Sequence, residues 1–310
     1  MNAPCPAPAP VRTTWRPAHP VDVRGTLSSL RRGAGDPTYR RTPDGAVWRT
    51  TWLPTGPATC CVWQDGSGEV QARAWGPGAE EAVAGVPELL GARDDPAGFE
   101  ARHPLVAALH QRHPGLRVPR TGRVVEALVP AVLEQKVTGK QARDAFRWLV
   151  LRYGEPAPGP APAGMRVPPP AAVWRRIPSW DWHKAGVDPQ RSRTVVAAMA
   201  VAGRLEECTG LAPPEAERRL RAQPGIGIWT AAEVAQRALG DADAVSVGDY
   251  HLAAHVGWAL VGRPVDDDGM LALLEPWRPH RYRVVRLLER SGVAAPRFGP
   301  RLAIQDHRGH

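Results

Sequence analysis

An aspartate that follows a glycine-rich turn is the residue of this sequence best placed to do chemistry. The turn is Pro224 to Gly227, and Asp249 stands just before the next predicted helix. Glycines one residue apart allow a tight turn and a close approach of a partner to the backbone. The helix that follows has free N–H groups that favour an anion, such as a nucleic-acid phosphate bound without sequence readout. Negative charge is favoured at the position of Asp249, where a carboxylate can stabilise a cation or activate water.

Three predicted helices must hold these groups in place. One ends near Gln223, before the turn, and a second runs from Trp229 to Leu239. The apolar link from Ala244 to Val247 leads to Gly248 and Asp249, and a third helix is expected to start at Tyr250. Asp249 could also act only as the N-cap of that third helix.

The rest of the chain divides into a strand-rich part and a helical part. Strand-like runs separated by glycine turns are followed by helical patterns from Phe99 onward, after the break at Asp94 to Gly98. The strands are expected at 47–53, 59–64 and 70–75, with short helices at 21–32 and 80–89. The helices are expected at 103–113, 122–133, onward to 153, 171–177, 180–185, 191–207, from 213, 269–274 and 281–291. A proline-rich surface loop is expected at 154–170.

Composition favours a polyanionic partner. The 310 residues carry a net charge of +9, with arginine supplying nearly all of the positive charge. A solvated, arginine-rich surface is the simpler alternative. The four cysteines, Cys5, Cys60, Cys61 and Cys208, have no metal-ligand spacing, so we expect reduced thiols in a cytoplasmic protein that acts at the nucleoid. No apolar run approaches the ~20 residues of a membrane helix, so no membrane partner is expected.

The turn, the Trp-Thr-Ala that follows it and the spaced Asp249-Tyr250 pair resemble the bacterial 3-methyladenine DNA glycosylase II (AlkA) family, within the helix-hairpin-helix glycosylases. The segments 125–154 and 275–282 are similar to other parts of that family. The resemblance implies an α+β fold, with a small N-terminal antiparallel sheet and helices followed by an all-α helix-hairpin-helix domain. The implied boundaries are a disordered tail at 1–11, the first domain at 12–95, the glycosylase domain at 96–295 and a basic tail at 296–310.

The resemblance implies base excision from damaged double-stranded DNA. We expect one copy of the chain to act, because the substrate presents a single damage site and is not symmetric. Asp249 would stabilise the oxocarbenium-like sugar while a flipped, alkylated purine leaves. The lyase branch of the superfamily has a Schiff-base lysine where this chain has Trp229, and no lysine follows Lys184, so we expect no strand cleavage. Trp229 could stack on the base or be a core residue.

The expected base pocket contains Trp229, Glu233, Tyr250 and Leu288. Glu233 and Leu288 stand where the family pattern has aromatic residues, so the pocket loses walls and could gain a carboxylate. Glu233 could contact the base, hold water or point to solvent. These departures leave two other functions open: a glycosylase for another lesion, with Glu233 as the acid, or a DNA-binding protein without catalysis.

DNA contacts are expected from the hairpin and from scattered polar and basic residues. Gln135 or Val137 could fill the gap left by the flipped base, and we favour a phosphate contact for Lys136. No cofactor and no side-chain metal site is expected, although the resemblance implies that the hairpin carbonyls could bind a monovalent cation. The expected DNA-binding residues are Gly225, Ile226, Gly227, Thr230, Gln135, Lys136, Lys140 and Arg193, with Arg143, Arg191 and Arg237 as further phosphate contacts.

Overall fold

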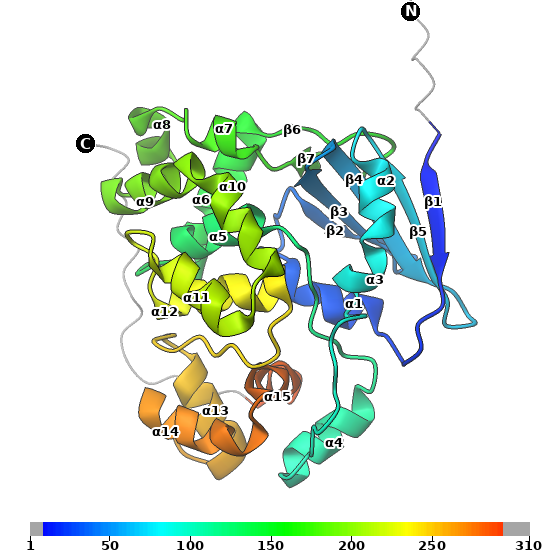
Figure 1. The fold of residues 1–310 in the computed structure, drawn as a ribbon, viewed down its shortest axis with the longest axis vertical. Coiled ribbons are helices and arrows are strands. Elements are labelled where there is room, and N and C mark those ends of the chain that lie inside the picture. The colour runs from blue at the N-terminus through cyan, green and yellow to red at the C-terminus, as the bar shows by residue number, and fades with distance from the viewer. Residues whose placement is uncertain (1–8, 294–310) are drawn as a thin grey trace, which may run out of the picture.

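The computed structural model describes residues 9–293, and a five-stranded antiparallel sheet forms its N-terminal part (Figure 1). The strand order is β1-β5-β4-β3-β2. Within each strand, alternate residues point to opposite faces, so Val47 and Val62 meet helices while Trp48 and Trp63 lie on the other face. The strands are β1 (Val11–Trp15), β2 (Tyr39–Arg41), β3 (Val47–Leu53), β4 (Gly56–Gln64) and β5 (Val70–Trp75).

Short helices cover one face of this sheet. They are α1 (Val23–Leu27), η1 (Ser28–Leu30), α2 (Ala79–Ala84) and α3 (Val86–Leu89). Leu27 and Val83 pack with the inward residues of the strands in one buried cluster. On the opposite face, Trp48 stacks on Trp75 with ring centroids 5.5 Å apart. Trp48 and Trp75 therefore serve as packing residues on this face.

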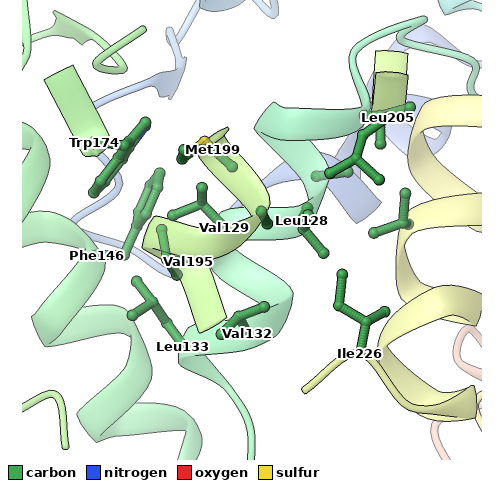
Figure 2. Close-up of a cluster of buried hydrophobic side chains, with 14 of the residues drawn as sticks. Leu128, Val129, Val132, Leu133, Phe146, Trp174, Val195, Met199, Leu205 and Ile226 are labelled. Carbon is green, nitrogen blue, oxygen red and sulfur yellow. The ribbon is translucent and has the colours of Figure 1, made fainter. Parts of the chain in front are cut away.

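A larger apolar core holds together the helices that carry the hairpin (Figure 2). Leu128 and Val132 from α5 meet Val195 and Met199 from α9, and Ile226 of the hairpin joins the same cluster. The helices are α5 (Val124–Leu133), α6 (Gly139–Tyr153), α7 (Ala171–Trp174), α8 (Ser179–Lys184), α9 (Pro189–Ala200), α10 (Ala202–Glu206), η2 (Glu207–Gly210), α11 (Pro213–Arg221), α12 (Ile228–Val234) and the π-helix η3 (Ala235–Leu239).

A separate core joins the C-terminal helices to α4. Val256, Met270, Leu274 and Leu288 are buried there together with Leu109 of α4. Figure 1 shows α4 beside α15, although about 170 residues separate them in the sequence. The elements are α4 (Pro104–Arg112), α13 (Leu252–Val261), α14 (Asp267–Leu274), η4 (Glu275–Trp277) and α15 (Arg281–Leu288).

The proline-rich segment is more ordered than the sequence indicated. Its two ends pair as the short strands β6 (Glu155–Pro156) and β7 (Arg166–Val167). Thr50 of the sheet donates a hydrogen bond to the Arg166 carbonyl at 2.6 Å, and Gly159 packs closely against the Trp75 side chain. The segment therefore fastens the helical part to the sheet.

Other expectations need correction at their ends. The expected helix at 80–89 is two helices, and that at 191–207 breaks at Val201. Strands β1 and β2 were not expected, and the last residue of the expected N-terminal tail, Val11, begins β1. Cys5 and the expected basic tail at 296–310 lie outside the described residues, and the other three cysteines are free thiols. Among residues 9–293, no helix is long and apolar enough to cross a membrane.

Candidate active site

The hairpin turn is built on one glycine that no other residue type could replace without strain. Gly225 has a φ of +83°, and a Cβ atom at this position would lie 2.2 Å from Thr194 Oγ1. Gly227 has an extended backbone, with open space where a Cβ would be, and it precedes α12 as the N-cap residue. The first glycine is therefore required by the turn, while the second leaves the backbone accessible.

Gln135 binds the hairpin to the turn between α5 and α6. Its Nε2 donates to the Gly225 carbonyl at 2.9 Å and to Thr230 Oγ1 at 2.8 Å. This amide thus orients two other protein groups, which limits its freedom to enter the DNA stack. The next residue, Lys136, has a φ of +54°, which is unusual for a lysine. Its side chain is exposed, so this turn lies at the surface.

Two of the expected DNA contacts are buried. Ile226 is 4% exposed and Thr230 is 2% exposed, so neither side chain can touch DNA. Ile226 packs in the core shown in Figure 2, and Thr230 accepts the hydrogen bond from Gln135. Contacts from this hairpin would therefore come from backbone groups.

The Asp249 carboxylate is held by three donors. Its Oδ1 accepts hydrogen bonds from the backbone amides of His251 at 2.9 Å and Leu252 at 3.0 Å. Its Oδ2 accepts one from the Trp229 indole Nε1 at 3.1 Å. Helix α13 begins at Leu252 and not at Tyr250, so Asp249 satisfies amides at the start of this helix and is partly exposed. The capping role and an accessible carboxylate therefore coexist.

The four residues of the expected base pocket have very different surroundings. Trp229 is half-buried against Asp249, and Tyr250 is 81% exposed. Leu288 is fully buried among the helices of the C-terminal core, so it cannot line an open pocket. Glu233 is buried as well, and the structure therefore brings only Trp229 and Tyr250 to the surface beside Asp249.

Both oxygens of Glu233 are already bound. Oε1 accepts a hydrogen bond from Ser246 Oγ at 2.6 Å, and Oε2 forms an ion pair with Arg237 at 2.8 Å. Burial lowers the pKa of Arg237, but Glu233 and the other acidic groups around it together outweigh burial, so this pKa is raised. Glu233 is thus buried, at 8% exposure, and bound to protein groups, so it does not face a base or solvent. The sequence indicated neither Ser246 nor this network, although the four-residue spacing of Glu233 and Arg237 is a signal for a helical ion pair.

The expected phosphate contacts divide into exposed and structural residues. Arg193, Lys140 and Arg143 are exposed, and Lys140 pairs with Asp144 on its own helix. Arg191 is 5% exposed and donates to the carbonyls of Leu133 and Gly186, so its role in DNA contact was wrongly expected.

Arg237 was also wrongly expected to contact phosphate. Besides pairing with Glu233, it donates through Nε to the Ser29 carbonyl at 3.1 Å. Its side chain is 14% exposed. A guanidinium that is this buried and bound to these protein groups has a structural role.

The largest cavity described lies away from these groups. It has a volume of about 340 Å³ and is lined by Trp52, Phe146, Trp174 and the N-terminal half of α5. No residue of the hairpin or of the Asp249 segment lines it. The hairpin contacts the opposite end of α5, so we assign this cavity no part in the site.

Comparison with known proteins agrees with this geometry. No protein-family model matches the sequence. The chain is 32% identical over 180 residues to a Mycobacterium tuberculosis protein described as a probable bifunctional transcriptional activator/DNA repair enzyme AlkA. The match covers 57% of this chain and 35% of that protein, so the chain spans about a third of its relative's length.

Solved structures show the same fold. A 3-methyladenine DNA-glycosylase from Archaeoglobus fulgidus superimposes with a TM-score of 0.74 at 16% identity, covering 90% of this chain and 98% of that one. Over 180 residues the chain is therefore similar to part of an AlkA protein, and its fold is that of the solved DNA glycosylases. An 8-oxoguanine glycosylase/lyase from Clostridium acetobutylicum gives a TM-score of 0.69 at 13% identity, covering 91% and 96% of the two chains. The resemblance drawn from the hairpin and the Asp-Tyr pair is thereby confirmed.

Two backbone carbonyls of the hairpin keep a lone pair that no described hydrogen bond uses. The carbonyls of Gln223 and Gly225 each accept one hydrogen bond, from the Ile226 amide and from Gln135. A carbonyl oxygen has two lone pairs, so each keeps one for a cation. Among residues 9–293, no group of three or more histidine, cysteine or acidic side chains could hold a metal.

Proposed function

We propose that the protein is a monofunctional DNA glycosylase that removes alkylated purines of the 3-methyladenine or 7-methylguanine type from duplex DNA. The observation that carries the proposal is the partly exposed Asp249 carboxylate, fixed by three donors beside a helix-hairpin-helix turn in a chain similar to part of an AlkA protein. The matched relative is much longer than this chain, so its description does not by itself assign an activity to this chain. The activity, the substrate and the DNA partner are therefore all part of the proposal.

Breaking the C1′–N bond leaves positive charge on the sugar. A fixed carboxylate stabilises this charge without having to reorganise, and it can also orient or deprotonate the attacking water. An alkylated purine is already cationic and leaves without an acid. This suits a site in which Glu233 is bound by Ser246 and Arg237. A neutral base would need an acid that this carboxylate is not free to supply.

The same helix supports the absence of lyase chemistry. Trp229 stands where the lyases of the superfamily carry a lysine, and its indole donates to Asp249. No lysine follows Lys184, so α12 offers no amine for a Schiff base. The product would be an abasic site with an intact strand.

DNA would be held by the hairpin backbone and by Lys136, Lys140 and Arg193, with one copy of the chain on each lesion. Tyr250, exposed next to Asp249, would contact the distorted strand. A monovalent cation on the carbonyls of Gln223 and Gly225 would supply positive charge to a phosphate. The division that we propose assigns support to the sheet at 12–95 and binding and catalysis to the helices at 96–295.

Release of methylated bases tests the proposal. Wild type and Asp249→Asn would be incubated with heavily methylated duplex DNA, and free bases measured by chromatography. We expect release by wild type and a loss on the order of 10²–10³-fold in the variant, the usual effect of removing a preorganised electrostatic group. Binding of both proteins to abasic-site DNA is the control, since asparagine can still accept from the two amides. Binding without release by wild type would reject the substrate class and favour another lesion or a binding role.

A further inference from the structure

Three residues of one helical face bind Asp249 and the segment that precedes it. Trp229, Glu233 and Gln236 are spaced four and three residues apart, the spacing of neighbours on one side of a helix. Trp229 donates to the Asp249 carboxylate. Glu233 and Gln236 bind Ser246, which lies three residues before Asp249. The face that carries the expected pocket residues of this helix is thus occupied by the Asp249 segment.

Ser246 is the residue through which that segment is bound. Its side chain is 4% exposed, donates to Glu233 at 2.6 Å and accepts from Gln236 Nε2 at 2.9 Å. The Asp249 amide donates to the Ser246 carbonyl at 3.2 Å, which closes the turn between them. Gln236 also donates to the carbonyl of Ala244 at 3.0 Å. Any shift of Ser246 would therefore be passed through this short turn to Asp249.

The far end of the network is anchored in the N-terminal part of the chain. Arg237 pairs with Glu233 and donates to the carbonyl of Ser29, which lies in η1. A buried carboxylate is costly unless it is paired, and Arg237 supplies the pairing. Arg237 and Gln236 both lie in the π-helical turn η3, a type of irregularity that is frequent at functional sites.

We propose that Glu233 and Ser246 are positioning residues, which hold the Asp249 carboxylate in register with Trp229. Glu233 acts through Ser246 and touches neither the base nor the sugar. For its effect on rate, the inference rests on the proposed glycosylase function. For the geometry of Asp249 it does not, and this allows the two to be tested separately.

Ser246→Ala is the decisive variant, because it removes one buried hydroxyl and leaves the Glu233–Arg237 pair intact. The first readout needs no activity: the indole N–H resonance of Trp229 in protein labelled with ¹⁵N-tryptophan. The resonance is assigned by its loss in Trp229→Phe. We expect Ser246→Ala to shift it and to speed its exchange with solvent. The second readout is the single-turnover rate of base release, where we expect a fall on the order of tenfold with unchanged affinity for abasic-site DNA.

Two further variants separate positioning from general destabilisation. Ser246→Thr keeps the hydroxyl and should restore the indole resonance and most of the rate. Thr50→Val removes another fully buried hydroxyl, one that bonds to the Arg166 carbonyl in the sheet. This control should lower the melting temperature and leave the Trp229 resonance and the rate unchanged.

Each outcome decides the inference. A shifted resonance with a slower rate in Ser246→Ala alone would support it. An unchanged resonance, or a shifted resonance with an unchanged rate, would overturn it, and so would an equal effect of Thr50→Val. If wild type releases no base, the proposed function fails, and the indole resonance alone then decides whether Ser246 holds Asp249 in place.

Discussion

The hydrogen bond from Trp229 to Asp249 can be removed with little change in shape. Trp229→Phe keeps an aromatic ring in the half-buried site and deletes the Nε1–H donor, 3.1 Å from Oδ2. Oδ1 keeps its bonds from the amides of His251 and Leu252. The variant therefore removes the partner of one carboxylate oxygen and leaves the main chain around Asp249 in place.

The size of the effect follows from the strength of this bond. A hydrogen bond to a charged group contributes about 1.5–3 kcal/mol. Because Asp249 is partly exposed, water weakens this bond, and we take its contribution as about 1–2 kcal/mol. At 1.4 kcal/mol for each factor of ten, this predicts a rate lower by roughly 5–30-fold. One effect opposes the loss, because a carboxylate without this donor carries more of its negative charge. We expect orientation to dominate, since stabilisation of the sugar cation depends on a fixed charge.

Single-turnover release from methylated duplex DNA measures this loss, with affinity for abasic-site DNA measured in parallel. The matched control is Trp277→Phe, which removes an indole bond of 2.8 Å to the Glu100 carbonyl in the C-terminal core. The control should lower the melting temperature and leave the rate unchanged. A stable Trp229→Phe protein with a wild-type or higher rate would refute the idea that the indole orients Asp249.

Three further predictions concern the hairpin, the arginines and the thiols. Gly225→Ala should lower the melting temperature, because alanine at a φ of +83° stores strain of about 1–3 kcal/mol. Gly227→Ala should leave the melting temperature unchanged, and equal melting temperatures of the two variants in fluorimetry would contradict this turn geometry. Arg191→Ala should destabilise the fold, because it leaves buried carbonyls unpaired. Arg193→Ala should keep the melting temperature but weaken DNA binding and make its salt dependence shallower, which anisotropy titrations at two salt concentrations would show. Burial raises the pKa of Cys60 to about 12, so at pH 8 only about 10⁻⁴ of this thiol is thiolate. Iodoacetamide should therefore label Cys60 only after unfolding, as measured by peptide mass spectrometry, and rapid labelling of the native protein would argue against its burial.

Local sequence patterns predicted the central strands well and the edge strands poorly. Strands β3 and β5 begin and end at the predicted residues because alternation and flanking glycines are local signals. Strand β4 ends at the predicted residue but begins at Gly56, earlier than the predicted 59. Strand β1 is short and polar on one face, and its partner β5 lies about 60 residues further along the chain. Pairing over that distance leaves no mark on the five residues of β1. The proline-rich segment was misjudged for the same reason, since its contacts with Thr50 and Trp75 are long-range.

Charge on a helix was the weakest guide to the site. Arg191 and Arg193 lie two residues apart on α9, yet the first is buried against carbonyls and the second faces solvent. Asp188, three residues before Arg191, was the local signal for an intrahelical pair. The surroundings of Glu233 were also mispredicted, because a carboxylate at a position where the family has an aromatic residue suggested a place in the base pocket. The burial of its partner Ser246, thirteen residues away, cannot be predicted from spacing.

Under the proposed function, the contacts of α12 would place DNA binding and catalysis on one element. The hairpin leads directly into α12, and Gln135 fixes the hairpin through Gly225 and Thr230. The same helix and its π-helical extension bind Asp249 through Trp229 and through Ser246. A phosphate bound at the start of α12 would then lie at a set distance from the carboxylate, with no loop movement between them. Binding the backbone in register would therefore bring the C1′ atom to Asp249. On this account, a change that shifts the hairpin, such as Gly225→Ala, should slow base release as well as weaken DNA binding.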